Sequence, residues 1–377
     1  MKVTMIAREF PPNVYGGAGV HLRYLVQELR KMISVEVRCF GEQNINEKNF
    51  KVRGYHAWES LTGDPQIGKA LQTISADLSI VNDLIDSDIV HTHTWYASFA
   101  GYLAKLLYRK PLVVTCHSLE PLRPWKEEQL GSGYKLSSWV EKLAIESADR
   151  VIAVSKVMKR DILKFFDIPS KKIKVIYNGI DLNKWKETKT DFTLKEYGIK
   201  DEYVLFVGRT TKQKGMIYLI EAAKDINANV VFCTSAPDTK EVEDEIRKKL
   251  KGTKNTLWIN KLLKEEQYIE LYSNASVFAC PSIYEPFGII NLEAMACKTP
   301  VVANAVGGIK EVVVDGKTGF FVEPANPKQL AEKMNLLLKD KKLAKIFGEN
   351  GRKRVEKYFD WKIIARQTMK LYEEILH

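Results

Sequence analysis

Two adjacent glycines near the start of the sequence could hold a phosphate group with backbone amides. Gly16 and Gly17 open the segment GGAGVH (residues 16–21), which separates an apolar run from an amphipathic helical pattern. Glycines let the backbone turn tightly and approach a ligand, and N–H groups at a helix start attract phosphate. A dinucleotide fingerprint would need glycine where Leu22 stands, so a nicotinamide dehydrogenase is not favoured.

Two cations in the second half of the chain could bind a diphosphate. Arg209 and Lys214 lie in VGRTTKQKG (residues 207–215), after an apolar strand and before a helical pattern. Arginine offers planar, bidentate contacts and lysine a point charge, and both could stabilise charge on a departing diphosphate. The alternative is a solvated basic loop.

A pair of carboxylates follows in EPFGIINLE (residues 285–293). Pro286 suits a helix start, which places Glu285 at the ligand-facing rim and Glu293 about two turns along the helix. There a carboxylate could accept both hydroxyls of a ribose. The expected unpaired amide donors of this helix are those of Phe287, Gly288 and Ile289. The alternative is a capping acid with an exposed helical glutamate.

Histidines end two successive apolar runs. His91 and His93 end one run, and His117 ends the next. Histidines at neighbouring strand ends indicate a shared cleft. We expect His91 and His93 on opposite faces of their strand and find no third ligand at zinc-like spacing, so no metal site is predicted. Arg123 and Lys126 follow His117 in a loop.

These motifs need sheets that place them at one edge. Apolar strands alternate with helical patterns in two series, which predicts an α/β protein of two doubly wound, Rossmann-like domains, 1–182 and 183–359. The linker is expected at 181–193. Ligands bind beyond the carboxyl ends of such strands. The formal DxD motif at residues 86–88 precedes its strand and is expected to be a capped turn at the opposite edge. The expected strands are 2–7, 34–39, 89–93, 112–115, 150–154, 173–176, 203–207, 230–233, 256–259, 277–280 and 300–303.

Composition narrows the function classes. The net charge of +11 divides evenly, +5 in residues 1–182 and +6 in residues 183–377, so nucleic-acid binding is not supported. No apolar stretch approaches the roughly 20 residues of a membrane span, and the N-terminus does not have the pattern of a signal peptide. Five scattered cysteines without a CxxC pair fit a reducing cytoplasm. We therefore expect a cytoplasmic protein without stable membrane association.

Together, these motifs resemble the retaining glycosyltransferases of family 4, which have the GT-B fold, over essentially the whole chain. Residues 285–293 are similar to that family's E-x7-E motif, Arg209 with Lys214 to its phosphate-binding pair, and residues 175–181 and 306–311 to further family segments. Residues 8–21 and 117–131 resemble more narrowly the short bacterial and archaeal glycogen synthases of the family, some of which act as maltose-1-phosphate synthases.

The resemblance implies roles for these residues. Glu285 would hold the transferred sugar and Glu293 the ribose, while His93 would lie against the anomeric carbon. No metal cofactor is needed, because cations and helix starts take the leaving charge. The two domains would face each other across a cleft, with the terminal helix, 360–377, crossing back to the first. The other implied donor ligands are Gly16, Gly17, Arg209, Lys214, Phe287, Gly288 and Ile289. The implied acceptor ligands are Tyr15, His117, Arg123 and Lys126.

The main expectation is a retaining glucosyltransferase that moves glucose from a nucleotide diphosphate glucose, ADP-glucose being favoured, to an α-1,4-glucan end such as glycogen. The alternative acceptor is glucose 1-phosphate, bound through Arg123 and Lys126, which would give maltose 1-phosphate. Two further hypotheses are a family 4 enzyme for another sugar acceptor and a non-catalytic protein that binds glucan or nucleotide. The sequence does not indicate an oligomeric state.

Overall fold

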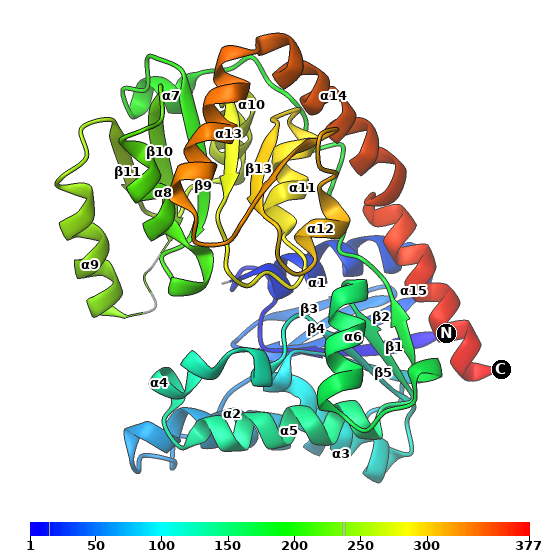
Figure 1. Cartoon of the computed structure of the whole chain (residues 1–377). Helices are drawn as coiled ribbons and strands as arrows, with labels where there is room; N and C mark the ends of the chain where they lie inside the picture. The colour runs from blue at the N-terminus through cyan, green and yellow to red at the C-terminus, as the bar shows by residue number, and fades with distance from the viewer. Residues whose placement is uncertain (15, 236, 238) are drawn as a thin grey trace. The chain divides into compact units, whose positions relative to one another are not determined.

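The computed structural model describes residues 1–377 except 15, 236 and 238, and the side chains of these residues except 65, 66, 128 and 129. The chain forms two compact units: residues 1–178 with 361–377, and residues 179–360 (Figure 1). The sequence places these limits at 182/183 and 359/360, within a few residues of those in the structure.

The first unit is built on an eight-stranded sheet with the order β3-β4-β2-β1-β5-β6-β7-β8. All neighbouring strands pair in parallel except β3, which is antiparallel to β4. The strands are β1 (Lys2–Ala7), β2 (Ser34–Phe40), β3 (Asn44–Glu47), β4 (Phe50–Tyr55), β5 (Ile89–His93), β6 (Leu112–Cys116), β7 (Arg150–Ala153) and β8 (Ile173–Val175).

Helices cover both faces of this sheet, which explains why its central strands are buried throughout. Every residue of β5 and β6 is buried. Helices α2, α3 and α5 pack together on one face, and α1 lies with α15 on the other. The main helices of the unit are α1 (Gly17–Leu29), α2 (Pro65–Asn82), α3 (Ser98–Tyr108), α5 (Gly133–Ser147), α6 (Lys156–Phe165) and α15 (Trp361–Leu376).

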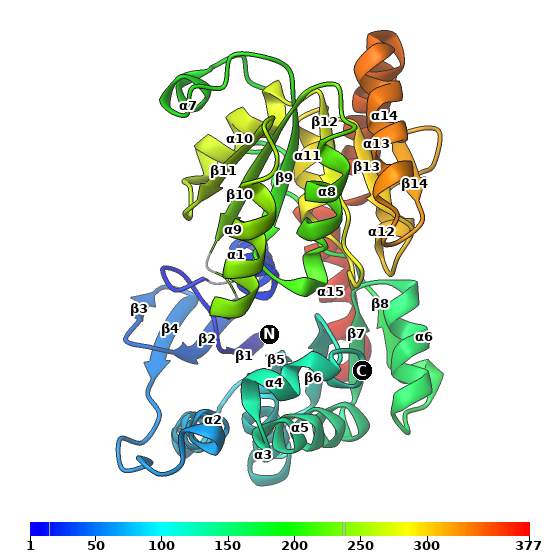
Figure 2. The ribbon, with the colours of Figure 1, turned by 60° about the vertical axis from the view of Figure 1, so that its left-hand side comes forward.

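The last helix of the chain, α15, belongs to the first unit. It packs beside α1 (Figure 2). Its Trp361, Ile364, Leu371 and Tyr372 join a core with residues of α1, β1 and β2. The crossing terminal helix expected from the resemblance is therefore confirmed.

The second unit holds a six-stranded, all-parallel sheet with the order β11-β10-β9-β12-β13-β14. Its strands are β9 (Tyr203–Arg209), β10 (Asn229–Ser235), β11 (Thr256–Asn260), β12 (Val277–Cys280), β13 (Val301–Asn304) and β14 (Gly319–Val322). Its helices are α7 (Phe192–Glu196), α8 (Met216–Ala223), α9 (Lys240–Leu250), α10 (Glu265–Asn274), α11 (Ile289–Ala296), α12 (Ile309–Val312), α13 (Pro327–Lys339) and α14 (Lys341–Tyr358).

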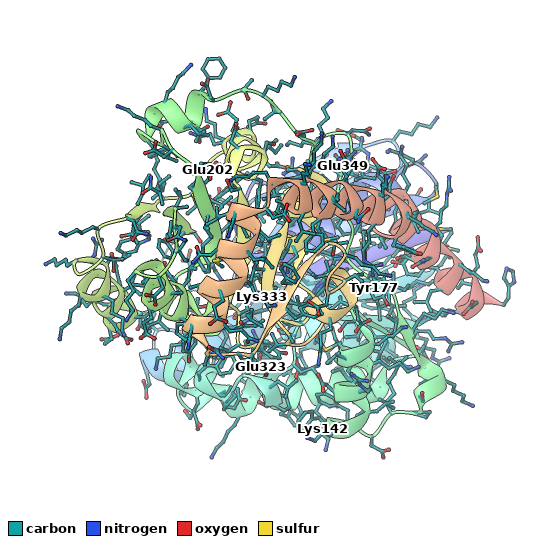
Figure 3. All side chains as sticks on the ribbon, turned by 45° about the horizontal axis from the view of Figure 1, so that its top comes forward. Lys142, Tyr177, Glu202, Glu323, Lys333 and Glu349 are labelled. Carbon is teal, nitrogen blue, oxygen red and sulfur yellow. The ribbon has the colours of Figure 1, made fainter. Side chains whose placement is uncertain are left out.

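Charged side chains lie on the outer faces of the helices. Lys142 on α5 is exposed and pairs with Glu146 one turn along, with 3.8 Å between Nζ and Oε1 (Figure 3). All five cysteines are free and buried, as expected for small core residues.

Three short strands were not apparent from the sequence: β3, β4 and β14. Each lies toward a sheet edge, and β3 is polar, so its pairing with β4 rather than its own pattern defines it. The expected linker, 181–193, also has partners. The N–H of Thr188 donates to Ser273 Oγ (3.1 Å), and Lys184 Nζ lies 2.7 Å from Glu265 Oε2, so this segment packs within the second unit.

Candidate active site

Four histidines meet at the carboxyl edge of the first sheet and form what we call the histidine cluster: His21, His91, His93 and His117. His21 lies on α1, His91 and His93 end β5, and His117 follows β6. His93 Nδ1 lies 3.1 Å from His117 Nε2, and the rings of His21 and His117 are 4.7 Å apart between centroids. The predicted pair, His93 and His117, is thus brought together, and His21 joins it.

The expectation that His91 and His93 point to opposite faces of β5 is wrong. Residues two apart in a strand point to the same face, and the two ring centroids are 4.3 Å apart. His91 is nevertheless different from its neighbours, because both of its nitrogens have partners. Nδ1 lies 2.6 Å from Tyr372 Oη and Nε2 lies 2.7 Å from Thr115 Oγ1. His91 therefore ties β5 to β6 and α15.

Burial keeps the cluster neutral. It lowers the pKa of His21 to about 4, against a smaller raising effect of the hydrogen bond to Asn178, and the pKa of His91 to about 3. Burial, and next the neighbouring imidazoles, hold the pKa of His93 and His117 well below 6.5. Uncharged rings can lie against a sugar and exchange hydrogen bonds with its hydroxyls without adding charge to the site.

The backbone around the cluster is shaped for close approach. Thr94, the residue after His93, has φ 67° and ψ 161°, a conformation that costs a β-branched residue of the order of 1–3 kcal/mol. Gly16 is the N-cap of α1, which no side chain of the described residues caps, and its N–H donates to Glu9 Oε2 (3.0 Å). Gly17 is the first residue of α1. The predicted acceptor ligand Tyr15 lies outside the described residues.

The loop after His117 is anchored by a buried carboxylate that the sequence analysis did not single out. Glu120 is fully buried, and it pairs with the Arg123 guanidinium through Oε1 and accepts from Ser137 Oγ (2.9 Å) through Oε2. Its N–H donates to Glu141 Oε2 (2.7 Å). Arg123 is therefore held in place by its own loop, and Lys126 follows one turn later, half-buried.

A second group of predicted residues meets at the carboxyl edge of the second sheet. Lys214 Nζ lies 2.6 Å from Glu285 Oε2, and both side chains are largely buried. Gly215 makes this approach possible. It has φ 65°, and a Cβ there would lie 2.0 Å from the carbonyl oxygen of Pro281. Arg209 ends β9 at the same edge and is exposed.

Helix α11 begins later than the sequence suggests. Its first residue is Ile289 and its N-cap is Gly288, at φ 95°, so the expected helix start at Pro286 is wrong. Residues 285–288 instead form an irregular turn, because the left-handed Gly288 cannot continue a helix. Of the three amides predicted as helix-start donors, Ile289 opens α11, while Phe287 and Gly288 precede it.

Glu293 therefore lies on the second turn of α11. Tyr272 Oη donates to its Oε2 at 3.0 Å. Burial raises the pKa of Glu293 to about 7, against the opposing effect of that hydrogen bond.

The glycines of residues 306–311 hold the Glu285 turn in place. The N–H of Gly308 donates to the carbonyl of Glu285 (3.0 Å). A Cβ at Gly307 would lie 2.0 Å from the same carbonyl oxygen. The two glycines allow this close contact between backbone segments, and the contact fixes the position of the Glu285 backbone.

Similar proteins are known for both units of the chain. Residues 189–354 match the family "Glycosyl transferases group 1", and residues 15–184 match "Glycosyltransferase Family 4". The α-maltose-1-phosphate synthase of Mycolicibacterium smegmatis is 43% identical over 397 aligned positions, which cover 100% of both chains. The chain belongs to glycosyltransferase family 4. It is a hexosyltransferase with two Rossmann-like units, as the GT-B resemblance implies.

Further comparisons give lower identities. The glycogen synthase of Mycobacterium tuberculosis is 26% identical over 407 positions, covering 99% of this chain and 94% of its own. Among solved structures, the sucrose-phosphate synthase of Thermosynechococcus elongatus has a TM-score of 0.83 at 24% identity, covering 99% and 98% of the two chains. In the described part of this family 4 glycosyltransferase, no helix has both the length and the apolar character needed to cross a membrane.

The structure thus gathers the predicted residues of this glycosyltransferase into two groups, one in each unit. His93, His117 and the glycine turn lie at the carboxyl edge of the first sheet, and Arg209, Lys214, Glu285 and Glu293 lie at that of the second. His21 was not among the site residues predicted from the sequence, although it ends the family-like segment 8–21, and its Nδ1 lies 2.6 Å from Asn178 Oδ1. Asn178 lies in the segment 175–181, which resembles the family, and this resemblance was the signal that could have pointed to it.

Proposed function

We propose that this family 4 enzyme transfers glucose from a nucleotide diphosphate glucose, preferably ADP-glucose, to glucose 1-phosphate, forming maltose 1-phosphate. The observation that carries this proposal is the 43% identity to α-maltose-1-phosphate synthase over both full chains. Glycogen as the acceptor, the main expectation from the sequence, has weaker support, because the glycogen synthase is 26% identical.

Each unit supplies a different part of the reaction in this proposal. In the second unit, Glu285 holds the hydroxyls of the transferred glucose, Glu293 accepts from the ribose, and Arg209 with Lys214 stabilises the departing diphosphate. Lys214 Nζ lies 2.6 Å from Glu285 Oε2, so this one cation can both orient the Glu285 carboxylate toward the sugar and face the diphosphate.

In the first unit, the N-terminal turn of α1 adds amides for the diphosphate, and His93 lies against the anomeric carbon. Transfer occurs with retention. We propose that no metal cofactor takes part, because these cations and amides receive the leaving charge.

The acceptor phosphate is assigned to Arg123 and Lys126. Glu120 neutralises part of the Arg123 charge but also fixes the direction of its guanidinium, and a fixed fork suits a phosphate. Purified protein should be given ADP-glucose or UDP-glucose with glucose 1-phosphate or glycogen, with and without a chelator, and the products identified by mass spectrometry and NMR. We expect maltose 1-phosphate from ADP-glucose, at a rate that the chelator leaves unchanged.

A variant separates the two acceptors. Arg123→Lys keeps the charge beside the buried Glu120 but loses the bidentate fork, so we expect KM for glucose 1-phosphate to rise about 10- to 100-fold. Activity on glycogen should change little, and Arg366→Ala, at an exposed arginine on α15, is the matched control. An equal loss on both acceptors, or glycogen elongation without maltose 1-phosphate, would refute the proposal.

A further inference from the structure

Three of the clustered histidines come from three separate elements and point toward a common centre. His21, His93 and His117 each offer a ring nitrogen, and these nitrogens all lie within 4.8 Å of one another. The distances between ring centroids are 4.7 Å for His21–His117 and 5.4 Å for both His21–His93 and His93–His117. Three imidazoles bound tetrahedrally to one Zn²⁺ at about 2.0–2.1 Å have centroids roughly 5 Å apart. The observed spacing is that of ligands around a single ion.

The hydrogen bonds of His21 leave the appropriate nitrogen available. Its Nδ1 lies 2.6 Å from Asn178 Oδ1, an atom that can accept but not donate, so Nδ1 carries the proton and Nε2 carries the lone pair. His21 Nε2 is buried and has no hydrogen-bond partner among the described residues. A polar group that holds the far nitrogen of a histidine in this way is the usual support of a metal-binding imidazole.

The other two rings present a closely spaced pair of nitrogens. His93 Nδ1 and His117 Nε2 are 3.1 Å apart, close to the roughly 3.4 Å that separates two nitrogens bound to one tetrahedral zinc. Nε2 of His93 is buried without a hydrogen-bond partner among the residues described.

The chemistry of the cluster selects the class of ion. His91 lies beside His93, but its two nitrogens are taken by Tyr372 and Thr115, so it is not a fourth ligand. Three uncharged imidazoles suit zinc, cobalt, nickel and copper ions, whereas Mg²⁺ and Ca²⁺ require oxygen ligands.

We propose that His21, His93 and His117 form a binding site for one divalent transition-metal ion of the zinc type, with the fourth position open. The ion is an inhibitor and not a cofactor. Since the proposed function places His93 against the anomeric carbon, and the family resemblance implies that His117 is an acceptor ligand, a bound ion excludes substrate. This consequence, unlike the binding itself, rests on the proposed function.

Cobalt binding tests the site without reference to activity. Tetrahedral Co²⁺ absorbs visible light far more strongly than aqueous Co²⁺, so the full-length protein is titrated with Co²⁺ and then with Zn²⁺ as competitor. We expect one equivalent to bind, with intense bands that Zn²⁺ abolishes. His21→Gln should weaken binding at least 10- to 100-fold, and Asn178→Leu about 10-fold. His56→Gln, at an exposed histidine outside the cluster, should bind as the wild type does.

The outcomes separate the two proposals. Circular dichroism first establishes that each variant is folded, and if His21→Gln is not, the half-buried His117→Ala replaces it. The metal site is overturned if no tetrahedral Co²⁺ spectrum appears. It is also overturned if His56→Gln loses binding while His21→Gln keeps it. Neither result bears on the proposal that the enzyme forms maltose 1-phosphate. Binding together with Zn²⁺ inhibition that His21→Gln relieves at least tenfold supports the whole inference. Binding without inhibition supports the site and overturns its competition with substrate.

Discussion

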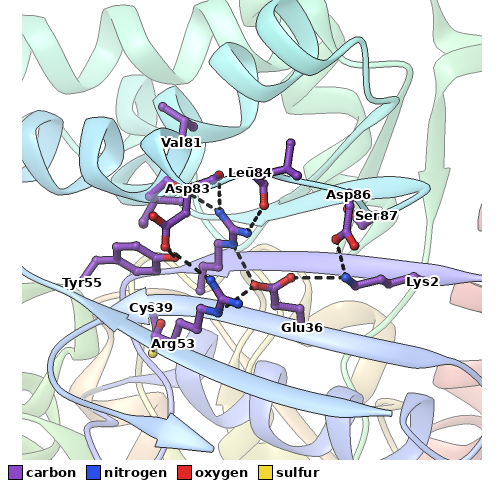
Figure 4. A network of polar contacts seen from close by, with 12 residues as sticks. Lys2, Glu36, Cys39, Arg53, Tyr55, Val81, Asp83, Leu84, Asp86 and Ser87 are labelled. Atoms are coloured by element: carbon purple, nitrogen blue, oxygen red, sulfur yellow. Dashed lines mark hydrogen bonds and ion pairs between the residues drawn. The ribbon is translucent and has the colours of Figure 1, made fainter. Parts of the chain in front are cut away.

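Polar side chains are buried toward both edges of the first sheet, but they differ in whether they have partners. On the side of β2 that faces the end of α2, Glu36 and Arg38 are 3% and 1% exposed and belong to a network of ion pairs that reaches Lys2 and Asp86 at the amino edge (Figure 4). Arg38 donates to Glu36 Oε1 (3.1 Å) and to the carbonyls of Ile80, Asp83 and Leu84 at 2.7–2.9 Å, at the end of α2.

The amino edge is thus closed by its own residues. Asp86 and Asp88, the DxD motif, bind Lys2 there, so the motif is a structural turn, as expected. A cavity of about 310 Å³ adjoins this network, and several charged side chains that line it, such as Lys2, Glu36 and Arg38, already take part in ion pairs. At the carboxyl edge, by contrast, buried nitrogens of His21 and His93 have no partner among the described residues. The proposed active site therefore lies at the edge where imidazole nitrogens, rather than paired charges, are buried.

Arg38→Met would test the amino edge most severely. It leaves Glu36 buried without its main partner and removes three donors from the end of α2, so the free energy of unfolding should fall by about 3–5 kcal/mol. Urea unfolding measures this change. Because the network is structural, kcat/KM of the folded fraction should stay at the wild-type value. A loss of activity without a loss of stability would show that the network takes part in the reaction.

His93→Ala is the corresponding change at the carboxyl edge. We expect kcat/KM to fall about 10²- to 10³-fold, since in the proposed function the sugar loses the group that positions its anomeric carbon. The free energy of unfolding should fall by only about 1–3 kcal/mol, because removal of the ring leaves His117 without its partner, and kcat/KM is therefore measured on the folded fraction. Loss of stability with retained activity would show that the cluster is structural.

Acid should weaken the carboxyl edge first. The pKa of His21 falls from 6.5 in the unfolded chain to about 4 in the folded protein. Between these values the unfolded state binds the extra proton, so the stabilisation is complete above pH 6.5 and is lost as the pH falls toward 4. The contribution is about 3 kcal/mol.

Urea unfolding at pH 7 and pH 4.5, compared between wild type and His21→Gln, isolates the His21 contribution. The variant should depend less on pH. Identical pH profiles for the two proteins would count against a buried, neutral His21.

Tyr372→Phe should have the smallest effect, because it removes one hydrogen bond from the buried contact between α15 and His91. The lost partner leaves His91 Nδ1 unsatisfied, at a cost of about 1–3 kcal/mol in unfolding free energy. Tyr358→Phe on α14, where the side chain is 44% exposed, is the matched control and should change stability by less than about 0.5 kcal/mol. If Tyr372→Phe and Tyr358→Phe changed stability equally, the hydrogen bond between Tyr372 and His91 would have no structural role.

The sequence predicted the parts of the molecule that depend on local pattern. Runs such as Tyr203–Val207 became β9 (Tyr203–Arg209), and the motifs at strand ends fell at the carboxyl edges. Parallel strands collect their ends at one edge, so Lys214 and Glu285 could be associated although 71 residues separate them. Where local pattern was weak, as in the polar strand β3, or where a left-handed Gly288 delayed α11, the prediction failed.

The sequence by itself determined the two α/β units, the family and the strand ends that carry the chemistry, because hydrophobic periodicity and glycine and proline positions act over short stretches of chain. The tertiary structure alone decided which histidines meet and which of their nitrogens are satisfied. His21 comes to lie against His93 and His117 through the packing of α1, and Asn178, 157 residues away in sequence, orients its ring. Burial and hydrogen bonding depend on such distant neighbours, so a single residue in a helical pattern cannot reveal them.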